Sequence, residues 1–281
     1  MKLHLTAFLL CFCFLTSVTA QDPVEIIDKM YAAIKKMNKS SFELHSKERF
    51  GDKYVYKNMK FHIQESPRKV YMKDLDKGVE LLYVTGWNNN KGYINPNGFP
   101  WVNVSLSVYD SKVVAENHHT VDDAGFGFVN VLLDGFESTG KKAGKERSAL
   151  YTYKGEVTYE GKACYKVYLY PPTEFKYVSY TTDRDQNLMQ LSRRIVASDF
   201  LIKEKNNLSY ARTIKKGTKL TVPSNYAKKV IVYIDKKTYM PIVQMLYDEQ
   251  GLFEKFEYKK VVAYPKFQSN EFTTDCSTYG F

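Results

Sequence analysis

Apolar and polar residues alternate regularly towards the C-terminal end of the chain. In the first of three such segments, Val230, Val232 and Ile234 share one face. The segments run over residues 229–235, 241–248 and 252–261. An alternation of period two, interrupted by turn residues such as Gly251, predicts an antiparallel meander with one buried face.

A helix is predicted shortly before the first strands. Asp22 can serve as its N-cap, and Pro23 suits the first helical position. Ile27, Met30 and Ile34 recur at steps of three and four residues, so one face of the helix is apolar and must be buried. We expect this helix to lie across a sheet.

Short strand patterns follow this helix and indicate an extended antiparallel sheet. They cover residues 42–49, 53–65, 69–73, 79–84, 151–159 and 164–170. Strands at this spacing favour an α+β protein over alternating β-α units. A second helix is predicted over residues 121–137, and the glycines from Gly135 to Gly144 predict a mobile connection after it.

Between Ser179 and Pro223 the strand pattern is interrupted by two short helices. Asn187 and Ser198 are suitable N-caps for them, which gives the order strand, helix, helix, strand. Nine Lys and Arg against four Asp and Glu give this insert a charge of +5. Such a basic segment can meet an acidic polymer or can be an ordinary solvated face, and the sequence leaves both open.

The insert resembles a LysM module, the small glycan-binding unit of cell-wall proteins. The matching residues are Tyr180-Thr181, Leu188, Leu191-Ser192, Val196-Ala197-Ser198, Ile202, Asn206 and the run from Gly217 to Pro223. Where LysM modules usually carry Gly-Asp in the first turn, this chain has Asp185-Gln186. The resemblance implies a βααβ fold with a sugar groove, whose residues here would be Arg184, Asp185, Gln186, Asn187, Asn206 and Asn207.

The rest of the chain resembles a family of exported bacterial proteins of unknown function that is related in fold to the LolA-type lipoprotein carriers. The resemblance rests on residues 66–73, 78–84, 95–101 and 118–120 and on the meander. It implies a curved, incompletely closed antiparallel half-barrel, built from residues 21–178 and 224–281 and covered by helices, whose apolar hollow binds acyl chains. The 23 tyrosines and 17 phenylalanines can line such a hollow or fill a core.

The N-terminus has the pattern of a signal peptide over residues 1–20. Lys2 is followed by an apolar run from Leu5 to Leu15, which is too short to span a bilayer, and Ala20 provides a small residue for cleavage. We therefore expect an exported protein that resides in the periplasm.

Cleavage would leave two cysteines, Cys164 and Cys276, in an oxidising compartment. A disulfide between them is the natural expectation and would contribute about 2–4 kcal/mol, while two unpaired buried thiols are the alternative. The formal charge is +10, or +9 without Lys2, which favours acidic lipid head groups or cell-wall carboxylates as surroundings. A nucleic-acid partner is not expected, because no recognition motif occurs.

His118 and His119, with Asp122 and Asp123 close behind, form the one cluster in the sequence that suggests a metal or a general base. Adjacent histidines point in divergent directions and the spacing places no third ligand. A buried, hydrogen-bonded pair that anchors the start of the helix near Gly125 is the favoured interpretation. No nucleophile elbow, zinc-protease helix or phosphate loop occurs, so we predict no catalytic residue, metal or cofactor.

These observations predict a non-enzymatic periplasmic binding or carrier protein for a lipid or lipidated peptide, held near the peptidoglycan glycan by the insert. The alternative is a cell-envelope interaction protein in which the sheet is only a scaffold and the basic insert carries the function. A hydrolase that uses His118 or His119 is a third hypothesis.

Overall fold

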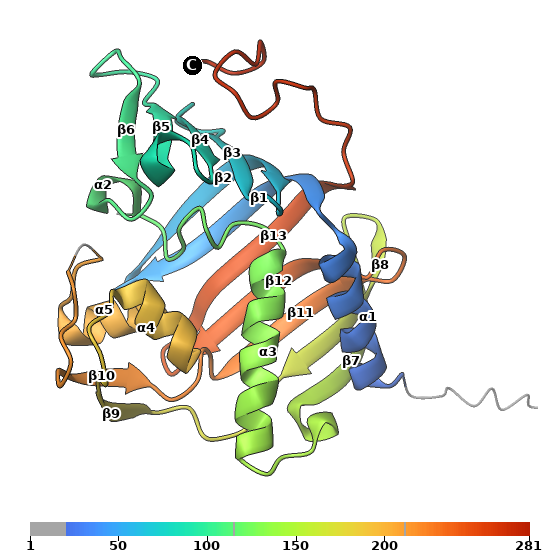
Figure 1. Ribbon diagram of the computed structural model, residues 1–281. Coiled ribbons are helices and arrows are strands. Elements are labelled where there is room, and N and C mark those ends of the chain that lie inside the picture. The colour runs from blue at the N-terminus through green and yellow to red at the C-terminus, as the bar shows by residue number, and fades with distance from the viewer. Residues whose placement is uncertain (1–20, 115, 211) are drawn as a thin grey trace, which may run out of the picture.

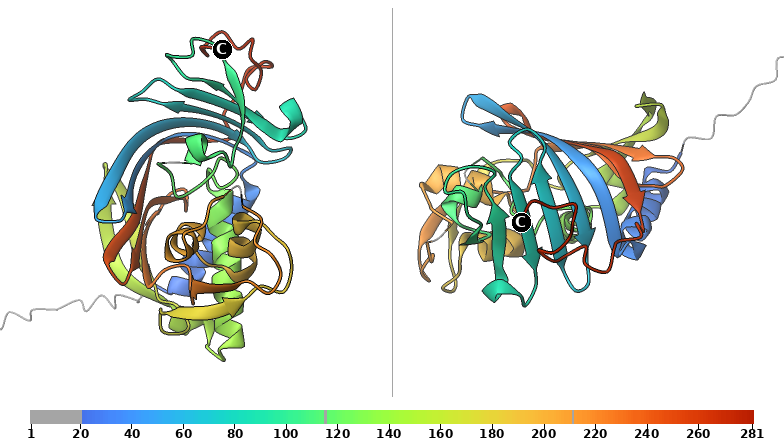
Figure 2. Two further views of the ribbon diagram at one scale, coloured as in Figure 1. Left: turned by 90° about the vertical axis from the view of Figure 1, so that its left-hand side faces the viewer. Right: turned by 90° about the horizontal axis from the view of Figure 1, so that it is seen from above.

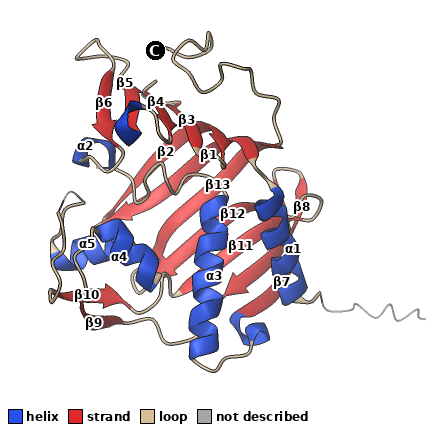
Figure 3. Cartoon of the chain, viewed as in Figure 1, coloured by secondary structure: helices blue, strands red, loops and turns tan. Residues whose placement is uncertain are grey.

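The computed structural model describes residues 21–114, 116–210 and 212–281, so the predicted signal peptide over residues 1–20 lies outside the described residues. Within this part of the chain, eleven strands form one antiparallel sheet in the order β6-β5-β4-β3-β2-β1-β13-β12-β11-β8-β7 (Figures 1 and 3). The remaining two strands, β9 and β10, form a small sheet of their own. The predicted α+β class with a large curved antiparallel sheet is confirmed.

The strands of the large sheet are β1 (Lys39–Phe50), β2 (Lys53–Gln64), β3 (Lys69–Asp74), β4 (Glu80–Val84), β5 (Lys91–Asn95), β6 (Val104–Ser107), β7 (Tyr151–Tyr159), β8 (Lys162–Leu169), β11 (Lys229–Asp235), β12 (Pro241–Asp248) and β13 (Gly251–Ala263). The small sheet pairs β9 (Tyr177–Thr181) with β10 (Lys219–Pro223). The helices are α1 (Pro23–Lys36), α2 (Ser111–Val114), α3 (Gly127–Lys142), α4 (Leu188–Ile195) and α5 (Asp199–Asn206). Short 3-10 turns occur at Asn88–Asn90 and Arg147–Leu150.

The large sheet curls around α1 and α3, which lie on its concave side (Figure 2). The predicted N-cap of α1 is confirmed, because the side chain of Asp22 accepts a hydrogen bond of 2.9 Å from the N–H of Val24. Ile27, Met30 and Ile34 of this helix are buried in the main core, as their spacing predicts. Burial of this apolar stripe holds α1 against the sheet.

Helix α3 corrects the expected boundary of the second helix and the expected mobile connection. It begins at Gly127 and continues to Lys142, through the glycine-rich segment. The glycines serve close packing: a methyl group on Gly135 would lie 2.5 Å from the side chain of Val196, and one on Gly140 would lie 2.8 Å from Leu150. Two neighbours can therefore approach the helix more closely than any larger residue would allow.

The last residues of the chain lie against the outer face of β2 and β3. His62 and Tyr71 alternate with core residues along these strands, and both meet the C-terminal segment. The ring of Tyr279 stacks on Tyr71 with centroids 3.5 Å apart, and Glu271 pairs with His62. The C-terminal segment therefore covers aromatic side chains that would otherwise face solvent.

The predicted disulfide is absent, because Cys164 and Cys276 are both buried and free. Cys164 lies in β8, whereas Cys276 lies in the segment that carries Tyr279 onto β3. Five strands separate β8 from β3 in the sheet, which amounts to about 29 Å along the sheet at about 4.8 Å per strand. A disulfide needs Cα atoms within about 7 Å of one another.

The insert has the predicted βααβ order, with a small core of its own. It packs against one end of the half-barrel: Phe200 of α5 forms a cluster with Leu201 and Phe253 of β13. Arg193 of α4 pairs with Asp123 at 2.6 Å. The insert is therefore held to the half-barrel by apolar packing and by charge.

The ion pair of Arg49 with Asp248 should contribute strongly to stability, because both side chains are almost fully buried. Arg49→Met would leave the Asp248 carboxylate buried without its partner, and we expect the free energy of unfolding to fall by about 3–5 kcal/mol. Urea denaturation at neutral pH measures this change. Lys29→Met, which removes the exposed pair with Glu25, is the matched control and should leave the midpoint unchanged. Equal midpoints for Arg49→Met and the wild type would contradict the prediction.

Candidate functional site

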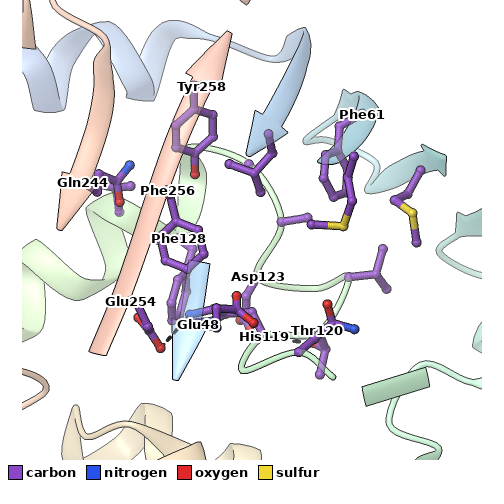
Figure 4. Close-up of a pocket in the computed structure, with 18 of the residues that line it drawn as sticks. Glu48, Phe61, His119, Thr120, Asp123, Phe128, Gln244, Glu254, Phe256 and Tyr258 are labelled. Atoms are coloured by element: carbon purple, nitrogen blue, oxygen red, sulfur yellow. Dashed lines mark hydrogen bonds and ion pairs between the residues drawn. The ribbon is translucent and has the colours of Figure 1, made fainter. Parts of the chain in front are cut away.

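An apolar hollow lies between α3 and the concave face of the sheet (Figure 4). Its empty volume is about 910 Å³, which includes the open mouth. Apolar side chains from the sheet and from α3 make up most of its wall, among them Leu44, Met59, Phe61, Met72, Leu81, Phe128, Val129, Leu132, Leu246 and Phe256. A concave hollow with this apolar lining is typical of a site for an apolar ligand.

A second apolar hollow continues from the first along the same helix. Its empty volume is about 790 Å³, and Met30 of α1, Phe136 of α3 and Val232 of β11 are among its lining residues. Both hollows are lined by Val129, Leu132, Tyr226, Gln244 and Leu246, so they adjoin. The lining residues of α3 run from Phe128 to Thr139, a length of about 16 Å at the helical rise of 1.5 Å per residue.

Aromatic rings fill the core next to the first hollow and also contribute to its wall. The ring of Phe42 lies 5.3 Å from that of Phe61, 5.4 Å from that of Phe126 and 5.2 Å from that of Tyr258, measured between centroids. Phe61 and Tyr258 present another part of their rings to the hollow. Both of the roles that the sequence left open for the aromatic residues therefore occur together.

Two buried carboxylates lie opposite each other at one end of the first hollow. Glu48 of β1 and Glu254 of β13 are direct cross-strand partners, and both line the hollow. Glu254 is 0% exposed and Glu48 is 4% exposed. Like charges directly opposite each other destabilise a sheet, so this pair needs hydrogen-bond donors or cations close by.

His118 supplies several of these donors. Its backbone N–H donates to Glu48 Oε2 at 3.0 Å, and its ring Nδ1 lies 2.9 Å from Glu254 Oε1. Its ring Nε2 donates to the carbonyl of Arg49 at 2.8 Å, because a carbonyl oxygen can only accept. The ring of Phe200 from the insert stacks on that of His118, with centroids 3.8 Å apart, and holds it in place.

His119 provides the neighbouring positive charge, with Nε2 lying 3.3 Å from Glu254 Oε1. Burial by itself lowers the pKa of His119, but the charge of Glu254 and the hydrogen bond to it outweigh burial and raise this pKa to about 10. Burial raises the pKa of Glu254, and the two histidines outweigh it and lower this pKa to about 2. At neutral pH the two side chains therefore form a buried ion pair.

Further acidic groups lie at or near this end of the hollow. Glu254 Oε2 has no hydrogen-bond partner within the described part of the chain. Asp123 also lines the hollow, where it is paired with Arg193 of the insert. Burial raises the pKa of Asp199, the first residue of α5, to about 6. We call the lining residues Glu48, His119, Asp123 and Glu254, together with the buried residues His118 and Asp199 that do not line the hollow themselves, the polar end of the hollow.

Residues 37–197, more than half of the chain, match the family described as "Protein of unknown function (DUF1571)". The chain belongs to the DUF1571 family. The match covers the strands from β1 to β9 and α4 but ends before α5 and the meander. The predicted membership of a family of unknown function is thus confirmed, and no curated protein matches the sequence.

Several solved structures show a distant likeness to this DUF1571 protein. MucB is 10% identical with a TM-score of 0.43, and the match covers 92% of this chain and 64% of MucB, so the chain spans less than two thirds of that protein. LprF from Mycobacterium bovis is 12% identical with a TM-score of 0.43, over 89% of this chain and 96% of LprF. The LolA superfamily protein NE2245 from Nitrosomonas europaea is 9% identical with a TM-score of 0.33, over 91% of this chain and 99% of that one.

The six residues expected to form a sugar groove in the DUF1571 insert have partners within the chain. Arg184 pairs with Asp183, and Asp185 pairs with Lys215. Gln186 is buried in a bridge with Ile214. Asn187 caps α4, and Asn207, at the C-cap of α5, has a φ of 49°.

The sixth residue, Asn206, bonds to the backbone of Thr221 in β10 and also lines an open polar groove. The other lining residues of that groove include Arg212, Lys215 and Lys219. Asn206 is the one of the six predicted residues that lines this groove, and the glycan site stays a prediction.

The interpretation of His118 and His119 as a hydrogen-bonded pair before the second helix is confirmed for His118, which is buried, while His119 lies at the wall of the hollow. Among the described residues, no group of three His, Cys, Asp or Glu side chains converges as metal ligands would. The sequence reasoning missed Glu48 and Glu254. The signal was present, because Glu254 occupies an inward position in phase with Phe256 and Tyr258.

Every helix in the described ranges is too short or too polar to cross a lipid bilayer.

His119→Gln should change how stability depends on pH above neutrality. The folded protein holds the His119 proton up to about pH 10, whereas the unfolded chain releases it near its ordinary value of about 6.5. The resulting stabilisation is complete below about pH 6.5 and is lost as the pH rises towards about 10. Urea titrations across this window should show that the free energy of unfolding of the wild type falls as the pH rises. His119→Gln should already be less stable at the acidic side, and its free energy of unfolding should change less with pH.

Glu254 keeps its charge throughout this window because its pKa is low. The difference between the two pH profiles of stability therefore reports on the His119 proton. His45→Gln, on the outer face of β1, is the matched control and should retain the wild-type slope. Parallel profiles for His119→Gln and the wild type would show that the ion pair does not stabilise the fold.

Proposed function

We propose that this DUF1571 protein is a non-enzymatic binding or carrier protein whose hollow encloses the acyl chain of a lipid or of a lipidated peptide. The observation that carries this proposal is the pair of adjoining apolar hollows beneath α3. Burial of apolar ligand surface contributes about 25 cal/mol per Å², so a long chain enclosed there binds without any specific polar contact.

The polar end of the hollow adds a preference for the head group. Three carboxylates, Glu48, Asp123 and Glu254, line this end and disfavour an anionic head group placed beside them. His119 already supplies a positive charge there. A neutral head group that carries hydroxyl or amide N–H donors avoids this repulsion and leaves the ion pair of His119 with Glu254 undisturbed.

The arrangement also favours binding over chemistry. The two histidines are engaged by Glu254 and by the carbonyl of Arg49, and the raised pKa of His119 keeps its ring protonated and thus unable to act as a base near neutral pH. We therefore infer that the polar end recognises a ligand. Residence in the periplasm, attachment of the insert to peptidoglycan, and the alternative role of the sheet as a scaffold stay predictions from the sequence.

Leu132→Trp should abolish binding of an acyl chain, because Leu132 lines both hollows and an indole ring at this position fills the space between them. We expect at least about a tenfold loss of affinity for monopalmitoylglycerol, measured by native mass spectrometry or by displacement of a fluorescent fatty acid. Val131→Trp places the same ring on the exposed side of the same helix and is the matched control. Equal binding by the wild type and Leu132→Trp, with both folded by circular dichroism, would refute the site.

Wild-type protein should bind monopalmitoylglycerol about tenfold or more tightly than palmitate, since the carboxylates at the polar end repel the carboxylate of palmitate but not a neutral head group. Competition between the two ligands against one fluorescent probe measures the ratio. Glu254→Gln should reduce this ratio, and unfolding titrations of the variant show whether it is folded. Tighter binding of palmitate would refute the assignment of the head group while leaving the acyl site intact.

A further inference from the structure

The loop between β5 and β6 exposes three large apolar side chains at one end of the sheet. Phe99 is 85% exposed, Trp101 is 80% exposed and Val102 is 62% exposed. Figure 1 shows this loop at the tip of the molecule, next to the end of the chain. Leu75, which is also exposed, lies in the β3–β4 turn at the same end of the sheet. A group of exposed apolar residues on a folded protein marks a surface for interaction.

Hydrogen bonds and close packing hold the base of this loop, and they fix its tip in an exposed position. The side chain of Asn97 donates to the carbonyl of Lys77 at 2.9 Å, and a methyl group on Gly78 would lie only 2.3 Å from that side chain. Asn95 donates to the carbonyl of Gly280 at 2.6 Å. The two turns and the end of the chain are therefore packed together beneath the apolar tip.

The backbone at the tip is strained at Trp101, whose indole ring is exposed. Trp101 has a φ of 62°, in the left-handed region that bulky residues seldom occupy. A hydrogen bond of 2.7 Å from its N–H to the carbonyl of Gly98 supports this conformation. Backbone strain that presents a large apolar side chain to water does not stabilise the folded protein, so its benefit lies in a contact made elsewhere.

The charge pattern indicates what makes that contact. The eighteen residues from Gly92 to Tyr109 contain no charged side chain, while the whole chain carries a formal charge of +10. Three asparagines, Asn95, Asn97 and Asn103, line an open polar groove directly behind the tip together with Trp101 and Val102. Apolar rings followed by uncharged polar groups match the change from acyl chains to head groups at a bilayer surface.

We propose that the β5–β6 loop is a membrane-docking tip that inserts Phe99, Trp101 and Val102 into the interface of a bilayer containing anionic lipid. The apolar side chains enter the interface, the asparagines lie at the level of the head groups, and the positive charge of the molecule strengthens the approach. This surface goes beyond the proposed ligand site and does not depend on it. It would let the part of the chain that the structure describes, in which no helix is long and apolar enough to span a membrane, rest on a bilayer.

Trp fluorescence tests the proposal directly, because the chain contains only two tryptophans, Trp87 and Trp101. In full-length Trp87→Phe protein the emission reports on Trp101 alone. Vesicles of phosphatidylcholine with phosphatidylglycerol should shift this emission to the blue, and lipids brominated near the head groups should quench it. The protein should bind more weakly to vesicles of pure phosphatidylcholine. Added salt should reduce the difference in affinity between the two vesicle compositions.

Phe99→Ser should weaken co-sedimentation with the anionic vesicles by about tenfold or more, since one exposed ring is lost from the inserted surface. Tyr56→Ser removes another exposed aromatic ring, near the start of β2, and is the matched control. This variant should bind as the wild type does. An unshifted Trp101 emission with both vesicle types would overturn the proposal. A blue shift that grows with protein concentration in the absence of vesicles would overturn it in favour of contact between two copies.

Discussion

The buried carboxylates of Glu48 and Glu254 impose the constraint on which much of this structure depends. They are cross-strand partners on the two central strands β1 and β13, where water cannot solvate them. Their mutual repulsion in a medium of low dielectric constant has to be offset by donors from outside the sheet. His118 and His119 supply these donors, and the segment that carries them is thereby fixed across the concave face.

The hollow follows from this arrangement. The segment held by the histidines leads into α3, which therefore starts at a fixed distance from the sheet. Gly135 and Gly140 let α3 approach Val196 and Leu150, while side chains of the same helix from Phe128 to Thr139 line the open space between it and the sheet. The insert closes the polar end through Phe200 and Arg193, so it contributes to the same site as the half-barrel.

Much of the fold could be read from the sequence, because its strongest patterns are local. The meander, the first helix with its Asp22 cap and the βααβ order of the insert all match the structure closely. The strands β5 and β6 were missed because they are short and lie between asparagine turns. The extent of α3 was misjudged because glycine signals flexibility in a sequence but can equally allow close packing.

The site was harder to predict because it depends on pairings distant in sequence. The likeness to a half-barrel implied a hollow, and the histidine pair marked one of its ends. The partner carboxylates could be recognised only as charged residues at inward positions of apolar strands, and the pairing of β1 with β13 has no local signature. The expected disulfide failed for the same reason, since cysteine spacing says nothing about which strands lie between.

The pairing of the first strand with the last also sets the order in which the molecule can fold. Ser41 meets Val262 across the middle of the sheet, so the centre of the sheet cannot close until nearly the whole chain is present. Contacts of such long range make for slow folding, with the edges of β1 and β13 unpaired in the meantime. A protein built in this way has to be kept from associating with its own copies until its two ends have met.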